Sequence, residues 1–487
     1  MVERASMNLR VVKNVKWYKA LERDFDYLLD SYYAFGFQPR YFRGMGLPNT
    51  PLNRLTIFDG RVYYDQNTAE VLKSYFLKRA SLAAVGTMLT RQFLRHARRY
   101  EVFLKKQKTA EYQNVSPHRL AGLYREFVDR VCACTPYSFL MSCLFEEVAW
   151  EAIAVSPVAI SRESYGRLTS NERATATTQE YRERLRLALK LKSVRDSRSS
   201  DKKLRSHLAR YAWLECYCPS DPPKSLGKLK QEVATLARRK EIESEVRALV
   251  RQSTAMRRQR TQMLKVLQLP AETLRLMTLM RENVWIRTYR RELFNYGFFV
   301  MRALHEEIAR RMALSLEQLR SVGVWDIGAF LEHGRQVSLK TIYARQNGYA
   351  IIRLGGRFFT LTGADVPKID PDKHRAQAQV KTISGTVAYP GRVSAPIQKV
   401  RNHSDLKHFK KGRILVAHTV ATWMLPAVER CVGIVADAGG VLAHTAILAR
   451  EFRKPCLVGT RIAMETLKDG DTVELDSTKG TVEVVSA

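Results

Sequence analysis

Residues 433–460 read GIVADAGGVLAHTAILAREFRKPCLVGT, and this stretch decides the fold of the carboxyl-terminal part of the chain. A short apolar run ends at Asp437, the glycine pair Gly439-Gly440 follows, and an apolar pattern of helical spacing begins near His444. A second apolar run, CLV, closes the stretch. The pattern predicts a strand, a glycine turn, a helix and a further strand, with His444 at the amino end of the helix.

A histidine at the start of a helix suits phosphoryl transfer. The first helical turn has backbone N–H groups without intrahelical partners and carries the positive end of the helix dipole, so it favours an anion such as a phosphoryl group on the imidazole. A neutral imidazole nitrogen is nucleophilic near pH 7. His444 is therefore the candidate catalytic residue, and a capping or surface histidine is the alternative.

Short β-branched runs with glycine punctuation continue on both sides of this stretch, including GTVAYPGRV, GRILVAHT, DTVELDS and GTVEVV. They predict a compact α/β domain over residues 380–487. Two prolines and mixed polarity in TGADVPKIDPDKHRAQAQ predict a linker over 366–379. Residues 1–365 then form a separate body, because single cores stop growing at about 250 to 300 residues.

The body reads as mainly helical with two small β-hairpin inserts. The helical pattern, with apolar residues three and four positions apart, covers 15–35, 69–108, 226–267 and 271–311. Alternating residues in LTIFDGRVYYD, and again around Gly355-Gly356, predict the hairpins. The basic segment SVRDSRSSDKK within 181–203 is predicted to be a solvated loop.

Charge is the unusual feature of the composition. The net charge is +33, and residues 376–487 hold 15 basic and 10 acidic side chains, so 28 of the net charges belong to the first 375 residues. Such a body attracts anions, including nucleic acid, nucleotides and acidic proteins. We expect polyanion binding through the basic body, and a general bias towards basic proteins in the source cell is the alternative.

Location and cysteine usage add three expectations. No run reaches the roughly 18 to 20 apolar residues of a membrane span, and the charged amino terminus lacks the apolar stretch of a signal peptide. The sequence therefore predicts a cytoplasmic protein without membrane association. Seven scattered cysteines predict buried, reduced thiols and no metal site, and a metal held jointly by Cys132/Cys134 and Cys216/Cys218 is the lesser alternative.

The string GGVLAHTAILARE, the preceding GRILVAHTVATWMLPAVERCVGIV and the following KPCLVGT and LKDGDTVELDSTKGTVEV resemble the mobile phosphohistidine domain of phosphoenolpyruvate-utilising enzymes. The resemblance spans about 380–487. It is shared with phosphoenolpyruvate synthase, pyruvate phosphate dikinase, enzyme I of the sugar phosphotransferase system and rifampicin phosphotransferase. It implies a swivelling β/β/α fold in which His444 carries the phosphoryl group between two active sites.

The resemblance also implies roles for other residues. Those implied to contact phosphate are Gly439, Gly440 and Arg450; those implied to support the site are Thr419, Trp423 and Thr445. For Arg450 a bracing ion pair with an acid such as Asp437 is the alternative. Leu442 and Ala443 stand where the family commonly has Thr and then Ser, Thr or Cys, and an apolar residue in the first place also occurs in the rifampicin-phosphotransferase branch.

No ATP-grasp pattern or GxxxxGK[ST] phosphate loop is found in the sequence. We therefore expect no cofactor on this chain, and a separate ATP-grasp protein, of the pyruvate phosphate dikinase ATP-binding type, that holds ATP and Mg²⁺ and charges His444; phosphoenolpyruvate is the other donor considered. The body, which resembles the central region of phosphoenolpyruvate synthase-like proteins, is expected to bind a small acceptor or to dock a partner. His207, Tyr211 and Trp213 are candidates for lining an acceptor pocket, with a place in the helical core as the alternative.

The second function considered is a basic anion- or nucleic-acid-binding module that retains a vestigial or regulatory swivelling domain.

Overall fold

The computed structural model describes residues 9–22, 26–47, 53–57, 61–79, 81–160, 162–169, 173–193, 197–239, 242–371, 382–401, 403–420, 424–437, 444–460 and 462–486. The chain divides into two compact units. Unit 1 consists of Met1–Leu21 and Phe25–Ile369, and unit 2 of Glu22–Asp24 and Asp370–Ala487. Each unit has its own sheet and its own buried core, so each is described separately.

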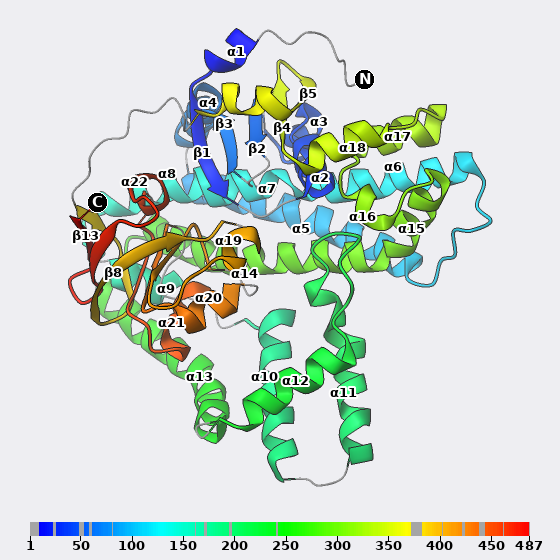
Figure 1. The fold of residues 1–487 in the computed structure, drawn as a ribbon. Helices are drawn as coiled ribbons and strands as arrows, with labels where there is room; N and C mark the ends of the chain where they lie inside the picture. Colours follow the sequence, from blue (N-terminus) through cyan, green and yellow to red (C-terminus); the bar gives the residue numbers. More distant parts are fainter. Residues whose placement is uncertain are drawn as a thin grey trace. The chain divides into compact units, whose positions relative to one another are not determined.

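Unit 1 is mostly helical (Figure 1). Its α-helices are α1 (Leu9–Lys13), α2 (Tyr27–Gly36), α3 (Pro39–Gly44), α4 (Gln66–Leu77), α5 (Leu82–Gln107), α6 (Pro117–Cys134), α7 (Pro136–Phe139), α8 (Glu146–Ala154), α9 (Arg162–Thr169), α10 (Ala176–Ser193), α11 (Ser197–Tyr211), α12 (Leu226–Ala237), α13 (Ile242–Leu267), α14 (Ala271–Val300), α15 (Arg302–Arg311), α16 (Leu316–Leu319), α17 (Val324–His333) and α18 (Leu339–Gln346). A π-helical turn, η1 (Leu140–Phe145), joins α7 to α8, and the 3₁₀ turns are η2 (Ala212–Glu215) and η3 (Gly363–Ile369).

The predicted mainly helical body is confirmed, with differences at particular segments. The pattern over 69–108 forms two helices, α4 and α5, and Ser81 caps the second by accepting the Ala84 N–H. The predicted helix over 15–35 is wrong in its first half, because Trp17–Glu22 is a strand. The predicted loop in 181–203 is also wrong: α10 and α11 fill most of it, and only 194–196 lie outside the described residues.

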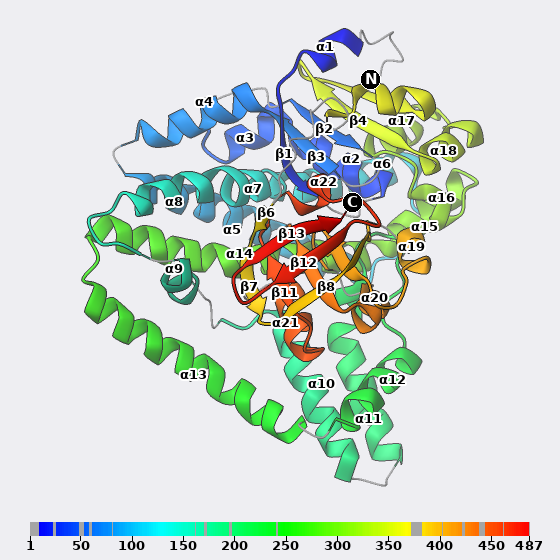
Figure 2. The ribbon, with the colours of Figure 1, turned by 60° about the vertical axis from the view of Figure 1, so that its left-hand side comes forward.

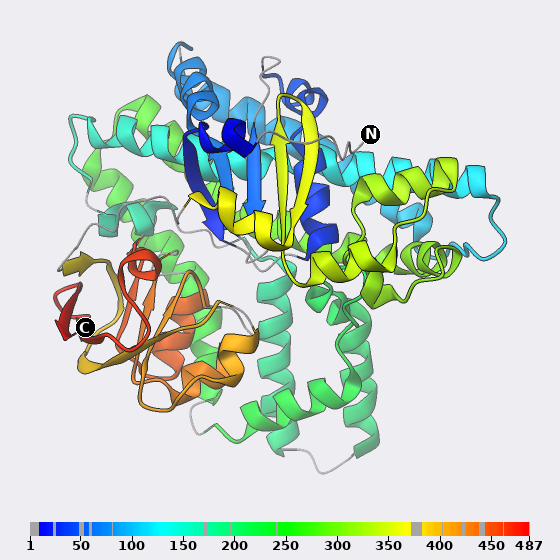
Figure 3. The ribbon, with the colours of Figure 1, turned by 45° about the horizontal axis from the view of Figure 1, so that its top comes forward.

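The two predicted hairpins belong to one sheet. Its strands, in the order β1-β3-β2-β4-β5, are β1 (Trp17–Glu22), β2 (Arg54–Ile57), β3 (Arg61–Asp65), β4 (Tyr349–Leu354) and β5 (Arg357–Thr362). Figure 3 shows the blue strands from the start of the chain beside the yellow strands from the end of unit 1. Gly355 and Gly356 turn the second hairpin at φ 55° and 82°, which explains the glycines; the Asp59-Gly60 turn lies outside the described residues.

The end of unit 1 lies a few residues beyond the predicted boundary. Val366 and Ile369, on η3, are buried in a cluster with Trp17 and Leu55 against one face of the sheet. The first part of the predicted linker 366–379 therefore belongs to unit 1, and 372–381 lie outside the described residues.

Unit 2 is built on an eight-stranded mixed sheet of order β6-β13-β12-β8-β9-β10-β11-β7, part of which faces the viewer in Figure 2. The strands are β6 (Thr382–Ser384), β7 (Thr386–Tyr389), β8 (Arg392–Lys399), β9 (Ile414–Ala417), β10 (Gly433–Ala436), β11 (Cys456–Val458), β12 (Thr472–Asp476) and β13 (Thr481–Ser486). Strands β8, β9, β10 and β11 run parallel, whereas β7, β12 and β13 pair antiparallel with their neighbours. The predicted α/β domain is confirmed.

The helices of unit 2 are α19 (His403–Lys407), α20 (Leu425–Arg430), α21 (His444–Glu451) and α22 (Ala463–Thr466). Residues of α20 and α21 bury apolar side chains with Leu415, Ile434 and Ala436 in one cluster. Residues of α22, β12 and β13 bury theirs with the alternate strand positions Val416 and Val435 in a second cluster. Successive strand residues face opposite sides, so the central strands are buried on both faces and read as continuous apolar runs.

Candidate functional site

The parallel strands of unit 2 bring three loops to one edge. The register pairs Ala436, the last residue of β10, with Ala417 at the end of β9 and with Val458 at the end of β11. The segments after these strands therefore start side by side. In open α/β sheets, ligands bind in the crevice beyond the carboxyl ends of parallel strands.

The helix α21 begins at His444, as the sequence predicts. Its neighbour Thr445 is completely buried, and its hydroxyl oxygen accepts a hydrogen bond of 3.0 Å from the backbone N–H of Val420. This bond ties the first turn of α21 to the loop after β9. The start of α21 is thus held at the edge where the parallel strands end.

Asp437 connects the end of β10 to the loop after β11. Its carboxylate is buried and accepts hydrogen bonds from Thr460 Oγ1 at 2.7 Å, from the Ala463 N–H at 2.7 Å and from the Met464 N–H at 3.0 Å. The last two donors belong to the first turn of α22, where a negative charge is favoured. Asp437 therefore fixes the backbone at the point where the chain leaves β10 towards His444.

Lys399 lies near the same edge, at the carboxyl end of β8 opposite Val416. Burial lowers the pKa of its ammonium group, with the charge of Arg401 adding to the effect, whereas Asp469, Asp471 and Asp437 oppose it. A lysine and a carboxylate thus share this buried edge. Sequence reasoning missed both Lys399 and Thr460, because neither stands in a local pattern; only the strand register places them near Asp437.

The structure describes the side chains of only some of the predicted site residues. Thr419 is half-buried and follows β9, and Thr445 is buried at the start of α21, so both lie by the strand ends. For His444 and Arg450 the description covers the backbone within α21 and not the side chain. Gly439, Gly440 and Trp423, like Leu442 and Ala443, lie outside the described residues.

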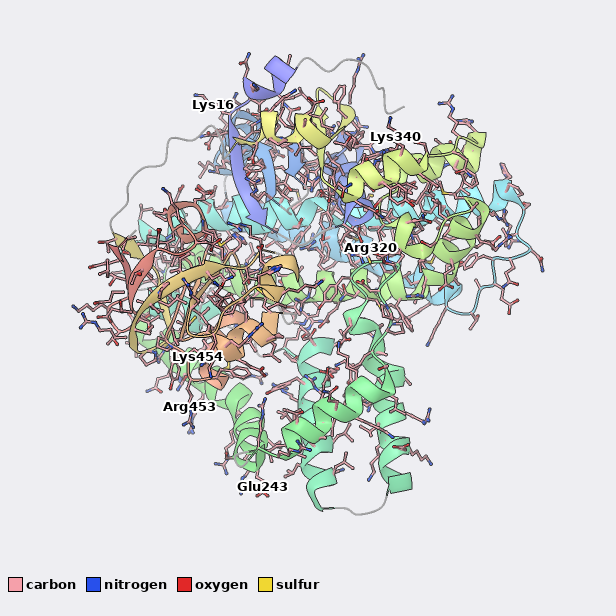
Figure 4. The ribbon with its side chains drawn as sticks, in the orientation of Figure 1. Lys16, Glu243, Arg320, Lys340, Arg453 and Lys454 are labelled. Carbon is pink, nitrogen blue, oxygen red and sulfur yellow. The ribbon has the colours of Figure 1, made fainter. Side chains whose placement is uncertain are left out.

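Other cations of this helix lie at its opposite end. Arg453 and Lys454 follow the carboxyl end of α21 (Figure 4). Positive charges are favourable there because this end of the helix dipole is negative. The helix has eight residues and is therefore about 12 Å long. These two cations stabilise α21 about one helix length from the backbone of His444.

The three residues considered for an acceptor pocket in the body make contacts within unit 1. His207 is buried, and its Nε2 lies 3.2 Å from Glu180 Oε1. The Tyr211 hydroxyl donates to Glu183 Oε1 at 2.9 Å, and the Trp213 indole N–H donates to the Arg210 carbonyl at 2.7 Å. The burial of His207 agrees with a place in the helical core.

The six cysteines whose side chains are described are free and buried. Across the described residues no group of three or more His, Cys, Asp or Glu side chains is arranged to hold a metal ion. Among the described helices, none combines the length and the apolar character needed to cross a bilayer.

Comparison with known proteins matches residues 409–480 to the mobile domain of phosphoenolpyruvate-utilising enzymes. The chain is 32% identical over 135 residues to a probable phosphoenolpyruvate synthase of Archaeoglobus fulgidus, covering 26% of this chain and 18% of that protein. It is 29% identical over 177 residues to a probable phosphoenolpyruvate synthase of Methanothermobacter thermautotrophicus, covering 36% and 26%. The uncharacterized phosphotransferase YvkC of Bacillus subtilis is 35% identical over 104 residues, covering 21% and 12%.

The matched segments thus span about a quarter or less of these relatives. The match to the Methanothermobacter protein is longer than unit 2, so it also includes part of unit 1. The edge formed by β9, β10 and β11, with α21 beginning at His444, lies inside the matched residues. Residues 409–480 are accordingly a mobile domain of the phosphoenolpyruvate-utilising enzyme family, and about a quarter to a third of the chain has distant similarity to phosphoenolpyruvate synthases.

Proposed function

We propose that unit 2 is a phosphohistidine carrier that accepts a phosphoryl group on His444 and delivers it to a small-molecule acceptor. The observation that carries this proposal is the start of α21 at His444, beyond the carboxyl end of the central parallel strand of a mobile-domain sheet. The first N–H groups of such a helix favour the dianionic phosphoryl group.

The transfer has two balanced steps. An imidazole nitrogen of His444 attacks the phosphorus of the donor, so an N–P bond forms, a P–O bond breaks and the oxygen leaves with the donor product. An acceptor oxygen then attacks the same phosphorus, the N–P bond breaks and the electron pair returns to the imidazole; the proton of a hydroxyl or water acceptor is released to solvent. Asp437 and Thr445 act by positioning, since one fixes the backbone before the loop and the other fixes the helix after it.

The finer part of the proposal concerns the partners. We place the donor site on a separate ATP-grasp protein that binds ATP and Mg²⁺, with phosphoenolpyruvate as the other donor, and the acceptor on unit 1. The names of the relatives, phosphoenolpyruvate synthase and phosphotransferase, support phosphoryl transfer as the reaction class. Their greater length supports the view that the complete reaction needs parts beyond the matched segment.

The test is labelling of the full chain with ATP carrying ³²P at the γ or β position, or with labelled phosphoenolpyruvate, in the presence of extract from the source organism. We expect acid-labile, alkali-stable label on the wild type and none on His444→Ala. The matched control is His418→Ala, which removes another histidine from the same edge of unit 2 and should keep the label.

The outcomes separate the alternatives. Label that is lost in His418→Ala and kept in His444→Ala would show that His418 carries the phosphoryl group and that His444 does not. No label with any of the three donors would overturn the carrier function. Label from the β position alone would indicate synthase-like chemistry. Label from phosphoenolpyruvate alone would show that the donor is phosphoenolpyruvate and would contradict the proposed ATP-grasp partner.

A further inference from the structure

One exposed face of α5 carries a dense row of cations, named here the α5 stripe. It consists of Arg91, Arg95, Arg98, Arg99, Lys105 and Lys106. All six side chains are exposed, and their spacings of three, four and seven residues place them on one broad face of the helix. Within the described part of the chain, none of the six makes a hydrogen bond or an ion pair.

Acidic groups do little to neutralise the α5 stripe. Glu101 is the one acid in α5, and its Oε1 accepts a hydrogen bond of 2.7 Å from the Tyr289 hydroxyl, so it is engaged inside the fold. His96, also on α5, has its Nε2 atom 3.3 Å from the carbonyl oxygen of Gly44. Burial lowers the pKa of His96, and the positive charges of Arg99, Arg95 and Arg130 lower it further. The positive charges of Arg95 and Arg99 are therefore felt by their neighbour His96, whereas the α6 cation Arg130 is paired with Glu126 at 2.9 Å.

The dimensions of the α5 stripe fit a row of phosphates. From Arg91 to Lys106 the helix rises about 22 Å, at 1.5 Å per residue. A duplex carries one phosphate per strand for roughly every 3.4 Å of its axis, so a surface of this length can contact several phosphates. The arginine fork also matches phosphate oxygens with two parallel hydrogen bonds.

The same face lacks the features of a protein interface. Interfaces between proteins depend on buried Trp, Tyr, Phe or Met anchors surrounded by polar groups. On α5, which is described in full, the one large hydrophobic side chain that is well exposed is Val102. Aromatic residues that would stack on single-stranded bases are buried here, as Phe93 and Tyr100 show.

We propose that the α5 stripe is a docking surface for the phosphate backbone of a nucleic-acid duplex, bound without reading its bases. The proposal does not depend on phosphoryl transfer at His444, because it concerns a helix of unit 1. It gives the basic body a specific contact surface in place of a diffuse positive field.

The test compares two triple variants of the full chain that remove the same charge. Arg91→Gln/Arg95→Gln/Arg98→Gln alters the α5 stripe. The matched control, Arg251→Gln/Arg258→Gln/Lys265→Gln, alters three exposed cations of α13, a helix that begins beside Glu243 (Figure 4). Binding to 24-base-pair RNA and DNA duplexes is measured by fluorescence anisotropy between 50 and 200 mM salt.

We expect the α5 variant to bind about tenfold or more weakly and its slope of log K against log salt to fall by about 2 to 3, since each cation accounts for roughly 0.9. The α13 control should stay within about twofold of the wild type, and His444→Ala should bind normally. Equal losses in both triple variants would show that the charge acts diffusely, and no binding at 50 mM salt would also overturn the proposal. Tighter, stripe-dependent binding of poly-glutamate would assign the surface to an acidic protein instead.

Discussion

At the residue scale, one buried carboxylate holds the chain where it leaves β10. Asp437 accepts three hydrogen bonds, and bonds to a charged group contribute about 1.5 to 3 kcal/mol each. An amide in its place offers one acceptor oxygen and turns an NH₂ group towards donors. We expect Asp437→Asn to destabilise unit 2 by about 2 to 4 kcal/mol, by the same estimate. Hydrogen exchange of peptides covering 433–466 should show faster exchange.

The control for this prediction is Glu429→Gln, which removes one exposed negative charge from α20 without touching the loop. It should leave exchange in 433–466 unchanged. Thr460→Val, which removes a single donor to Asp437, should have an intermediate effect. Unchanged exchange in Asp437→Asn would show that the carboxylate does not organise this edge.

A second residue-scale prediction concerns pH. His305 is completely buried, its Nδ1 donates to the Met301 carbonyl at 2.8 Å and its Nε2 lies 3.1 Å from the Tyr32 hydroxyl. Burial lowers its pKa from 6.5 to about 4. Between these values the unfolded chain binds the proton and the folded chain does not, so stability is full above pH 6.5 and falls as the pH drops towards 4. From pH 7 to pH 5 we expect the titration of His305 to lower the free energy of unfolding by about 2 kcal/mol.

The measurement is denaturant unfolding of unit 1 at pH 7 and pH 5, followed by tryptophan fluorescence, since five of the six tryptophans lie in unit 1. His305→Gln should be less stable at pH 7 and should show a smaller loss on going to pH 5. A variant with the same pH dependence as the wild type would contradict the role given to His305.

At the element scale, two long helices approach closely because each has a glycine at the contact. A Cβ built on Gly297 of α14 would lie 1.8 Å from the Tyr100 Oη of α5, and one on Gly86 of α5 would lie 2.1 Å from Leu279 Cδ2 of α14. Neither helix can accept a methyl group there without moving. We expect Gly297→Ala to destabilise unit 1 by about 1 to 3 kcal/mol, because overpacking outweighs the helix-propensity gain of alanine.

The matched control is Gly122→Ala on α6, where an added Cβ meets nothing within 4 Å. It should stabilise unit 1 by about 0.5 to 1 kcal/mol, the ordinary gain of alanine over glycine inside a helix. Thermal unfolding of both variants measures the difference. Equal shifts in the same direction would show that the α5–α14 contact has room for a side chain.

At the scale of the whole molecule, the two units have separate cores. The apolar clusters on both faces of the unit 2 sheet draw all their members from unit 2. We expect a fragment of residues 370–487 to fold alone and to unfold in one cooperative transition, measured by circular dichroism and by NMR dispersion. A fragment of 433–487, which lacks the central strands β8 and β9, should not fold. Failure of the longer fragment would show that unit 2 requires unit 1.

The sequence by itself determined the features that depend on neighbouring residues. The helix start at His444, the β4–β5 hairpin turned by Gly355 and Gly356, and the mixed α/β character of 380–487 each follow from periodicity and glycine placement within about ten residues. These signals are local because helix and turn formation depend on backbone conformation and short-range contacts.

Only the tertiary structure decided which distant segments meet. Trp17–Glu22 becomes a strand because it pairs beside β3, a contact that its helical spacing does not encode. Two hairpins separated by almost 300 residues become one sheet through the pairing of Leu55 with Ile352. Lys399, Thr460 and Asp437 share an edge because parallel register aligns the ends of β8, β10 and β11. Strand pairing joins residues of any sequence separation, so its outcome depends on the packing of the whole unit rather than on any local pattern.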